Sequence, residues 1–521
     1  MRKFDRPGRS AVLATGAMCA TSHPLAAQEA LAVMRAGGNA VDGAIAGAVI
    51  LGLCEPAMTG LGGDLFALVS EPGKPVVALN ASGRAPAGLT AEALRAEGHQ
   101  TVPVKSAHAV TVPGAVDGFC ALSERFGRKP LAELLAPAIR YAETGVPLAE
   151  RAADDWQVEG DGLSAEAARR LTPEGGPRRG ALFRDPGTAE VLRRIAAEGR
   201  DGFYAGEVAE DMVASLRALG GVHTLDDFAA TSSDWGSPIS GQYGGVDLLE
   251  HPPNGQGATA ILILNILKHF DIAAMDPWGA ERVHVEAEAT KLAYDARNRI
   301  IADPDHTARL EFMLSEETAA RLAALIRRDA VLPASLPGAE AVHKDTVYVT
   351  AVDENRMAVS LIYSIFHSFG SGLISDRFGI LFQNRGAGFT LELGHPNELG
   401  PRKRPMHTII PAMLAEGGTV TASFGVMGGQ YQSTGHARFV SNLRDFGLTP
   451  QEAIDGPRAF VENGELRVEG SYGPAVRQAL ADLGHPVTDP PRPIGGAQAI
   501  LLGEVLEGGS DPRKDGCAIG Y

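Results

Sequence analysis

The sequence predicts a layered α+β protein, and two observations carry that prediction. Residues from about 115 to 300 have mainly helical periodicity, whereas the last third of the chain alternates apolar and polar residues as β-strands do. Helices and strands therefore gather in different parts of the chain. Parallel nucleotide-binding folds instead alternate single strands with single helices, so a sandwich of helical and sheet layers is favoured.

The first hundred residues are expected to form two helices followed by two strands. Small and apolar residues recur at helical spacing from Pro24 to Leu53, and the turn-forming residues Gly37, Gly38 and Asn39 divide this stretch. The runs LFALV and PVVAL that follow are β-rich and bounded by glycine or proline, so each predicts a strand.

One long helix and a linker are expected before the sheet-rich part. The segment ERVHVEAEATKLAYDARNRIIADPDH has the clearest helical pattern, and its apolar stripe ends before Pro304. Residues 316–345 begin as a helix and continue as a linker rich in proline, alanine and glycine. This linker ends directly at Asp345 and Thr346.

After the linker the pattern changes to that of a sheet. Residues 346–366 alternate, with a polar turn at residues 353–356, so they predict a β-hairpin. Further strands are predicted at GILFQN, TIIPAMLA, TVTASFGV, GELRVEG and AQAILLG.

Composition restricts the class of function. The chain has 521 residues, of which 45% are apolar, and a net charge of −16. Because the acidic excess is spread along the chain, neither nucleic acid nor an anionic membrane is an expected partner. The expected partner is a small-molecule substrate. The four cysteines are scattered, which suggests neither a disulfide framework nor a zinc site. No signal-peptide or membrane-spanning run is visible, so a cytoplasmic location is expected.

Local motifs alone leave the chemistry open. The sequence has no G-x-S-x-G, Walker, dinucleotide-binding or H-E-x-x-H pattern, and its 14 histidines show no ligand spacing. Glycine clusters near residues 62, 370 and 428 adjoin expected strand ends, where backbone amides could bind an oxyanion. Tight turns are the commoner reason for such glycines. The local pattern around Thr346 predicts only the start of a strand.

Many motifs together, in one order, resemble those of the gamma-glutamyltransferase family of N-terminal nucleophile hydrolases. They cover nearly the whole chain and include GGNAVDGAIAG, GLGGDLF, VPGAVDGF, HPPNGQG, HVEAEATKLAYDARNRIIADPD, FGSG, QNRGAGF, RPMHTIIPAM, MGGQ and SDPRKDGCAIGY. The resemblance implies a four-layer αββα sandwich. It also implies that the precursor cuts itself between Asp345 and Thr346, giving a helix-rich large subunit, 1–345, and a sheet-rich small subunit, 346–521, that stay associated.

The same resemblance assigns the catalytic residues. Thr346 would be the nucleophile, and its α-amine, freed by cleavage, would be the base, with an unperturbed pKa of about 7.7–8.0. Ser364 would orient the Thr346 hydroxyl, and the amides of Gly428 and Gly429 would form the oxyanion hole. No metal or organic cofactor is implied, because nucleophile and base share one residue and the oxyanion hole is backbone.

The sequence departs from the family where glutamyl substrates are held. The family's asparagine corresponds to Phe366, and its Gln…Asp pair to Arg385 and Gly388. Losing an acid that pairs an ammonium and gaining a guanidinium favours a substrate that presents a carboxylate to Arg385. In these motifs the chain is more similar to the branch that contains oxamate amidohydrolase than to glutathione-cleaving members.

Three further residues are weaker candidates for substrate binding. The family's Ser-Ser pair corresponds to His407 and Thr408, and its upstream arginine to Ser82, with Arg84 two residues later. We therefore expect an autoprocessed amidohydrolase acting on a small carboxylate-bearing amide. A true gamma-glutamyl hydrolase or transferase and an inactive family member that binds a partner are the alternatives, and a dimer of heterodimers is left open.

Overall fold

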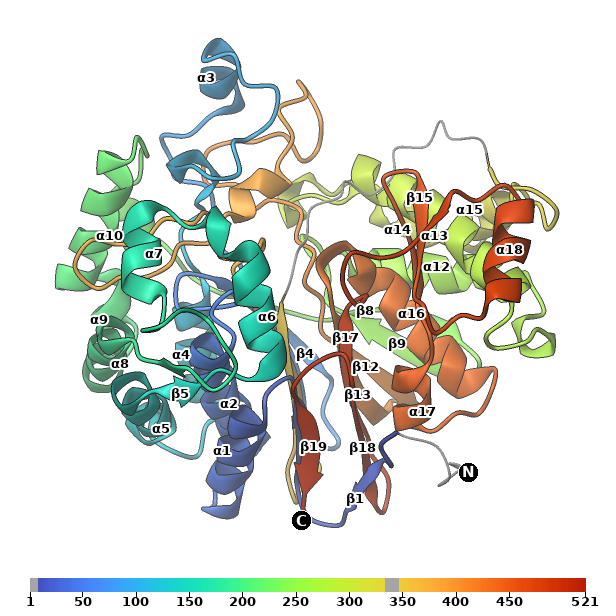
Figure 1. Ribbon diagram of the computed structural model, residues 1–521, viewed down its shortest axis with the longest axis horizontal. Helices are drawn as coiled ribbons and strands as arrows, with labels where there is room; N and C mark the ends of the chain where they lie inside the picture. Colours follow the sequence, from blue (N-terminus) through green and yellow to red (C-terminus); the bar gives the residue numbers. More distant parts are fainter. Residues whose placement is uncertain (1–7, 333–345) are drawn as a thin grey trace.

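The computed structural model describes residues 8–332 and 346–521, and in it two seven-stranded sheets face each other between outer layers of helices (Figure 1). We call them the β10 sheet and the β13 sheet. In spatial order, the β10 sheet contains β19 (Cys517–Gly520), β2 (Met18–Thr21), β10 (Val347–Val352), β11 (Ala358–Ser364), β3 (Asp64–Ser70), β4 (Val77–Ala81) and β7 (Asp234–Gly236). The β13 sheet contains β1 (Val12–Ala14), β18 (Leu506–Ser510), β17 (Gly496–Leu501), β13 (Thr419–Met427), β12 (Ala412–Glu416), β9 (Val246–Glu250) and β8 (Ile239–Tyr243).

Helices cover the outer face of each sheet. Those packed on the β10 sheet include α1 (Pro24–Arg35), α2 (Ala40–Cys54) and α4 (Ala115–Phe126), with α5 (Leu131–Thr144) and α8 (Pro186–Glu198) outside them. Those on the β13 sheet are α12 (Gly257–Leu267), α16 (Gln432–Arg444) and α17 (Pro450–Asp455), and α13 (Ala280–Ile300) packs on α12. The four layers are those of an αββα sandwich, which confirms the expected fold class.

The elements expected in the first hundred residues are present. Asn39 caps α2: its side chain accepts the Asp42 N–H at 3.0 Å, and the Asp42 carboxylate accepts the Asn39 N–H at 2.9 Å. This reciprocal capping starts a helix whose side chains are buried almost all round, as expected for a layer enclosed by α1, α5 and β10.

The hairpin expected after the linker is also present. β10 and β11 pair antiparallel with Val347 opposite Tyr363, and β10 is flanked on its other side by β2. Both strands are completely buried, because one face meets α2 and the other meets the β13 sheet. Residue 346 thus leads directly into a central strand.

Several strand predictions were wrong or missing. GILFQN is no strand: apart from an isolated bridge between Ile374 and Leu381, it has no ladder. It packs instead against the glycine loop before β3, where a Cβ atom at Gly62 would lie 2.1 Å from the Leu381 carbonyl oxygen. The stretch expected to be mainly helical contains β7, β8 and β9, which were not predicted. The strand expected at GELRVEG is present as β15 (Glu465–Val468), which lies in a separate three-stranded sheet.

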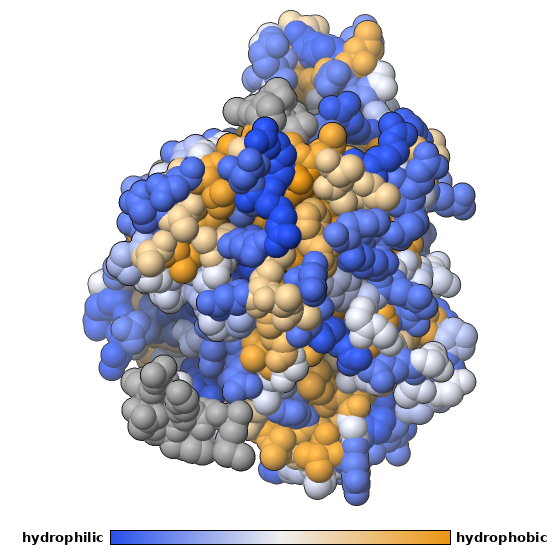
Figure 2. All heavy atoms as spheres, turned by 90° about the vertical axis from the view of Figure 1, so that its right-hand side faces the viewer, coloured by the Kyte–Doolittle hydropathy of each residue, from blue (hydrophilic) through white to orange (hydrophobic). Residues whose placement is uncertain are grey.

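One face of the molecule is mainly polar. Figure 2 shows the face on the side of α15 (Glu316–Ala323) and α18 (Pro474–Asp482), where hydrophilic side chains predominate and apolar patches interrupt them. Within the described residues, no helix is both long and apolar enough to cross a membrane.

Candidate active site

Thr346 and Ser364 lie side by side at one end of the β10–β11 hairpin. Because Val347 pairs with Tyr363, the register brings the residue before β10 next to the last residue of β11. The Thr346 hydroxyl donates to Ser364 Oγ at 3.4 Å, and the backbone N–H of Phe366 donates to the same Oγ at 2.9 Å. Both hydroxyl side chains are buried. A backbone amide therefore fixes Ser364, and Ser364 is within weak hydrogen-bonding distance of Thr346.

A close backbone approach shapes the strand next to this pair. Ser364 pairs with Asp64 on β3, and a Cβ atom at Gly63 would lie 2.5 Å from the Ser364 carbonyl oxygen. Only glycine fits at that separation. The glycines of GLGGDLF thus bring the start of β3 against Ser364.

Arg385 places a buried guanidinium beside the two hydroxyls. Its Nη2 donates to Ser364 Oγ at 3.4 Å, its Nη1 donates to Thr408 Oγ1 at 3.1 Å, and its guanidinium carbon lies 3.9 Å from the Phe366 ring centre. Among the residues that the structure describes, Arg385 Nε has no acceptor. Burial lowers the pKa of Arg385 to about 9, while the charge of Asp64 opposes that shift. The side chain therefore stays cationic at neutral pH and has a donor to spare.

Asp64 and His407 form a buried pair next to Arg385. The His407 Nε2–H donates to Asp64 Oδ2 at 3.1 Å, and His407 Nδ1 accepts the Ile409 N–H at 3.4 Å, which assigns the tautomer. Burial, and then the charge of Arg385, lowers the pKa of His407 to about 3. The imidazole is consequently neutral at ordinary pH. Asp64 Oδ1 accepts from the Gly83 N–H and from Gln383 Nε2, both at 2.8 Å.

The loop after β13 brings two unusual glycines to the same region. Gly428 and Gly429 have φ values of 115° and 55°, a backbone region that favours glycine. Tyr348, two residues beyond Thr346, lies against β13, since a Cβ atom at Gly425 would be 2.3 Å from its ring. Met427 shares a buried cluster with Tyr348. Within residues 8–332 and 346–521, the amides of Gly428 and Gly429 donate no hydrogen bond.

Arg84 lies apart from this group. It donates to Asp303 and Asp234, both at 3.4 Å, and to the Arg402 carbonyl at 3.1 Å. Arg84, Asp234 and Asp303 border a cavity of about 530 Å³ that His251 and Trp235 also line. The structure thus joins Thr346, Ser364, Arg385 and Thr408 by hydrogen bonds and leaves Arg84 in an ion-pair cluster elsewhere. The predicted cleavage partner Asp345 lies outside the described residues.

The family model for gamma-glutamyltranspeptidase matches residues 26–521, which is nearly the whole chain. The chain belongs to the gamma-glutamyltranspeptidase family. It is accordingly an enzyme of the N-terminal nucleophile class, whose members are hydrolases and acyltransferases.

Three known proteins are similar to the chain along nearly their whole length. The glutathione hydrolase-like YwrD proenzyme of Bacillus subtilis is 36% identical, over 98% of this chain and 99% of the relative. The oxamate amidohydrolase proenzyme of Klebsiella pneumoniae is 35% identical, over 98% and 100%. Among solved structures, a cephalosporin acylase from Bacillus halodurans superposes with a TM-score of 0.92 at 38% identity, covering 100% of this chain and 99% of that one.

Asp64 was missed as a functional candidate in this gamma-glutamyltranspeptidase family member. A signal for it was available, because Asp64 is the single charged residue in the glycine-rich and apolar run GLGGDLFALV. A carboxylate at the start of a completely buried strand needs partners, and here His407 and Gln383 supply them. Its proximity to Arg385 arises from pairing across the fold, which no local pattern reveals.

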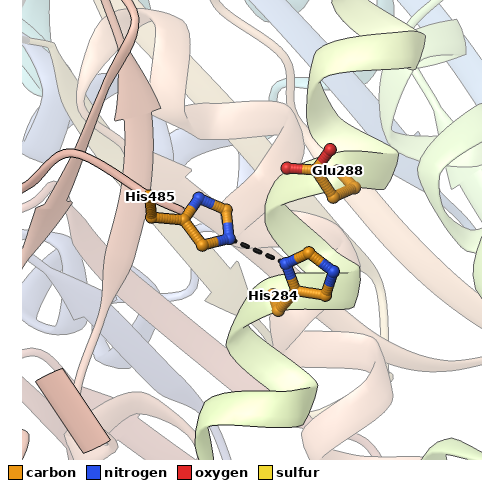
Figure 3. A group of neighbouring side chains, drawn as sticks. All are labelled: His284, Glu288 and His485. Atoms are coloured by element: carbon orange, nitrogen blue, oxygen red, sulfur yellow. Dashed lines mark hydrogen bonds between the residues drawn. The ribbon is translucent and has the colours of Figure 1, made fainter. Parts of the chain in front are cut away.

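Of the described residues, one group has the composition of a metal site: His284 and Glu288 on α13 with His485 (Figure 3). The two imidazoles contact each other, His284 Nδ1 to His485 Nε2, at 2.8 Å. Glu288 accepts from the Lys291 ammonium at 2.5 Å and from the Leu332 N–H at 2.7 Å. The two imidazoles contact each other and both Glu288 oxygens already accept hydrogen bonds, so these residues form a hydrogen-bonded cluster of this family member.

Proposed function

We propose that the chain is a self-cleaving amidohydrolase whose substrate is a small amide bearing a carboxylate, such as oxamate. The observation that carries this proposal is the buried cationic Arg385, which donates to Ser364 beside the candidate nucleophile Thr346. The corresponding positions in glutamyl-specific members, by resemblance, carry polar and acidic groups that suit an α-ammonium.

Thr346 would act as both nucleophile and base once cleavage frees its α-amine. The amine takes the hydroxyl proton as Oγ1 bonds to the amide carbon, and the resulting oxyanion accepts from the Gly428 and Gly429 amides. The C–N bond then breaks, and the proton passes to the leaving nitrogen. Water, deprotonated by the same amine, attacks the ester carbon, and the Oγ1–C bond breaks to restore the hydroxyl.

Arg385 would select the acyl group. A carboxylate next to the scissile carbonyl can accept from the guanidinium, including from the Nε–H that has no acceptor among the described residues. An α-ammonium in the same position would meet a buried like charge at high cost. The Phe366 ring against the guanidinium leaves less room for a long polar substrate on that side.

The processed chains would remain one particle. The candidate subunits 1–345 and 346–521 both contribute strands to both sheets: β10 lies between β2 and β11, and β12 between β9 and β13. Separating them would break ladders in the centre of each sheet. The expected product of cleavage is a stable heterodimer.

A gamma-glutamyl hydrolase is the second candidate function. The 36% identity to the glutathione hydrolase-like relative favours it. The 35% identity to the oxamate amidohydrolase favours the first candidate, an amidohydrolase that acts on oxamate or a similar amide. Because the two identities are so similar, they favour neither substrate, whereas the buried charge of Arg385 supports the carboxylate-bearing amide.

Two measurements test the proposal. Denaturing electrophoresis and intact mass should give two chains for the wild type, divided before Thr346, and one for Thr346→Ala. Ammonia release from oxamate should then exceed aniline release from a gamma-glutamyl anilide, compared as kcat/KM. An intact wild-type chain that turns over neither would favour the inactive binding protein, and a preference for the anilide would favour the second candidate.

A further inference from the structure

A buried arginine behind the glycine loop has no part in the function proposed above. Arg297 lies near the end of α13 and is 2% exposed. Its Nη1 donates to the side-chain oxygen of Gln256 at 2.7 Å and to that of Gln430, and its Nε and Nη2 donate to Asn298 Oδ1 at 3.0 and 2.8 Å. All three partners are neutral amides. A buried cation held this way is costly, and among the described residues no carboxylate is bonded to it to offset that cost.

Gln256 connects this cation to the candidate active site. As the residue that precedes α12, it donates through Nε2 to the Thr408 carbonyl at 2.7 Å and to the Gly429 carbonyl at 3.1 Å. A guanidinium can only donate, so Arg297 forces the Gln256 oxygen toward itself and both N–H groups toward the loop. Without the cation, the buried Gln256 oxygen would lose its Arg297 donor, and the amide would no longer be held from that side.

Gln430 gives the loop a second attachment to the same group. Its side-chain oxygen accepts from Arg297, and its backbone carbonyl accepts from the Tyr294 hydroxyl. The Arg297 guanidinium carbon lies 4.2 Å from the Tyr294 ring centre, so both attachments belong to one face of α13. The residues just after Gly428 are therefore held from behind by a single helix.

We infer that Arg297 is a positioning residue of the reaction: through Gln256 and Gln430 it fixes the amides of Gly428 and Gly429 relative to Thr346. This inference rests on the proposed function, because it presumes that those amides stabilise the oxyanion. Two consecutive glycines with positive φ have wide conformational freedom, so their placement must come from neighbours. Gln256 also donates to the Thr408 carbonyl, and the Thr408 hydroxyl accepts from Arg385. It thus connects the loop that carries Gly428 and Gly429 with the guanidinium that is proposed to bind the carboxylate.

The test compares Arg297→Lys with Arg282→Lys in the cleaved enzyme. Arg282 is a matched control: it is equally buried on the same helix, but it pairs with Glu286 at 2.9 Å, and none of its contacts reaches the loop. Lysine keeps the positive charge but lacks the planar guanidinium that donates several hydrogen bonds in fixed directions. Rates are expressed per cleaved chain, and thermal unfolding is recorded for both variants.

Arg297→Lys should lower kcat about 10- to 100-fold with KM changed less than about threefold, as expected when donors are misplaced by a fraction of an ångström. Arg282→Lys should keep kcat within about threefold at a similar loss of Tm. Gln256→Glu keeps an acceptor for Arg297 but loses both N–H bonds to the carbonyls, so it should reproduce the loss of kcat. If Arg297→Lys does not fold, Gln256→Glu is the variant that tests the inference.

The outcomes separate this inference from the function on which it rests. Equal kcat values for the Arg297 and Arg282 variants, or an unchanged kcat in Gln256→Glu, would overturn the positioning role while leaving an active wild type. A wild type that cleaves no amide would overturn both.

Discussion

Replacing Arg385 with glutamine should remove the preference for a carboxylate while keeping a polar side chain without charge. In the structure the guanidinium donates to Ser364 and Thr408 and keeps a donor to spare for a ligand. A hydrogen bond to a charged group contributes about 1.5–3 kcal/mol, which corresponds to about 10- to 150-fold in kcat/KM. The assay is ammonia release from oxamate and from oxamide, a neutral isostere. Arg385→Gln should lower kcat/KM for oxamate by that factor and change oxamide much less.

The pH dependence gives an independent check on Arg385. Because burial lowers its pKa to about 9, the guanidinium is charged below that pH and loses its charge as the pH rises through it. The kcat/KM for oxamate, which reports the free enzyme, should therefore fall above about pH 9, and that for oxamide should not fall in the same way. A ratio of the two substrates that is constant with pH and unchanged in Arg385→Gln would refute the role of this residue in binding.

Three other changes have defined expected results. Ser364→Ala should still fold but should slow both self-cleavage and turnover about tenfold or more, measured by electrophoresis against time, because Thr346 loses its hydroxyl partner. Gly428→Ala should lower kcat about 100-fold and also lower Tm, since its φ is 115° and the added Cβ would lie 2.7 Å from Gly495 Cα. His407 should give no titration between pH 5 and 8 in kcat/KM or in its NMR shifts, because its pKa is lowered to about 3; a break near pH 6.5 that His407→Gln removes would contradict this.

The parts of the fold that were predicted are those whose signal is local. The β10–β11 hairpin and helices α1, α2 and α13 each carry a continuous period and recognisable ends, such as the Asn39 cap. Strands β8 and β9 carry a weaker signal because they lie at the edge of the β13 sheet with partly exposed residues. GILFQN has the composition of a strand, but close packing against Gly62 holds it as irregular chain.

The candidate site was predictable only where resemblance supplied it. Thr346, Ser364 and Arg385 are separated in sequence and meet through strand register and a loop, so no spacing could have brought them together from first principles. Their roles remain predictions. Asp64, which accepts from His407, and Gln256, which donates to the Thr408 carbonyl, act across the fold, and the only local sign of either is one charge in an apolar run.

The position of Thr346 in the sheet suits the proposed cleavage before it and the proposed role of its α-amine as a base. β10 is hydrogen-bonded to β2 on one side and to β11 on the other, and every residue of it is buried. A new N-terminus at Thr346 would therefore be held in place by a buried strand, because the next residue, Val347, already pairs with Tyr363 on β11. An α-amine on a frayed chain end would lose its alignment with the hydroxyl, whereas this one would keep it. The same burial predicts that cleavage costs little stability, because the ladders on both sides of β10 form beyond the scissile bond.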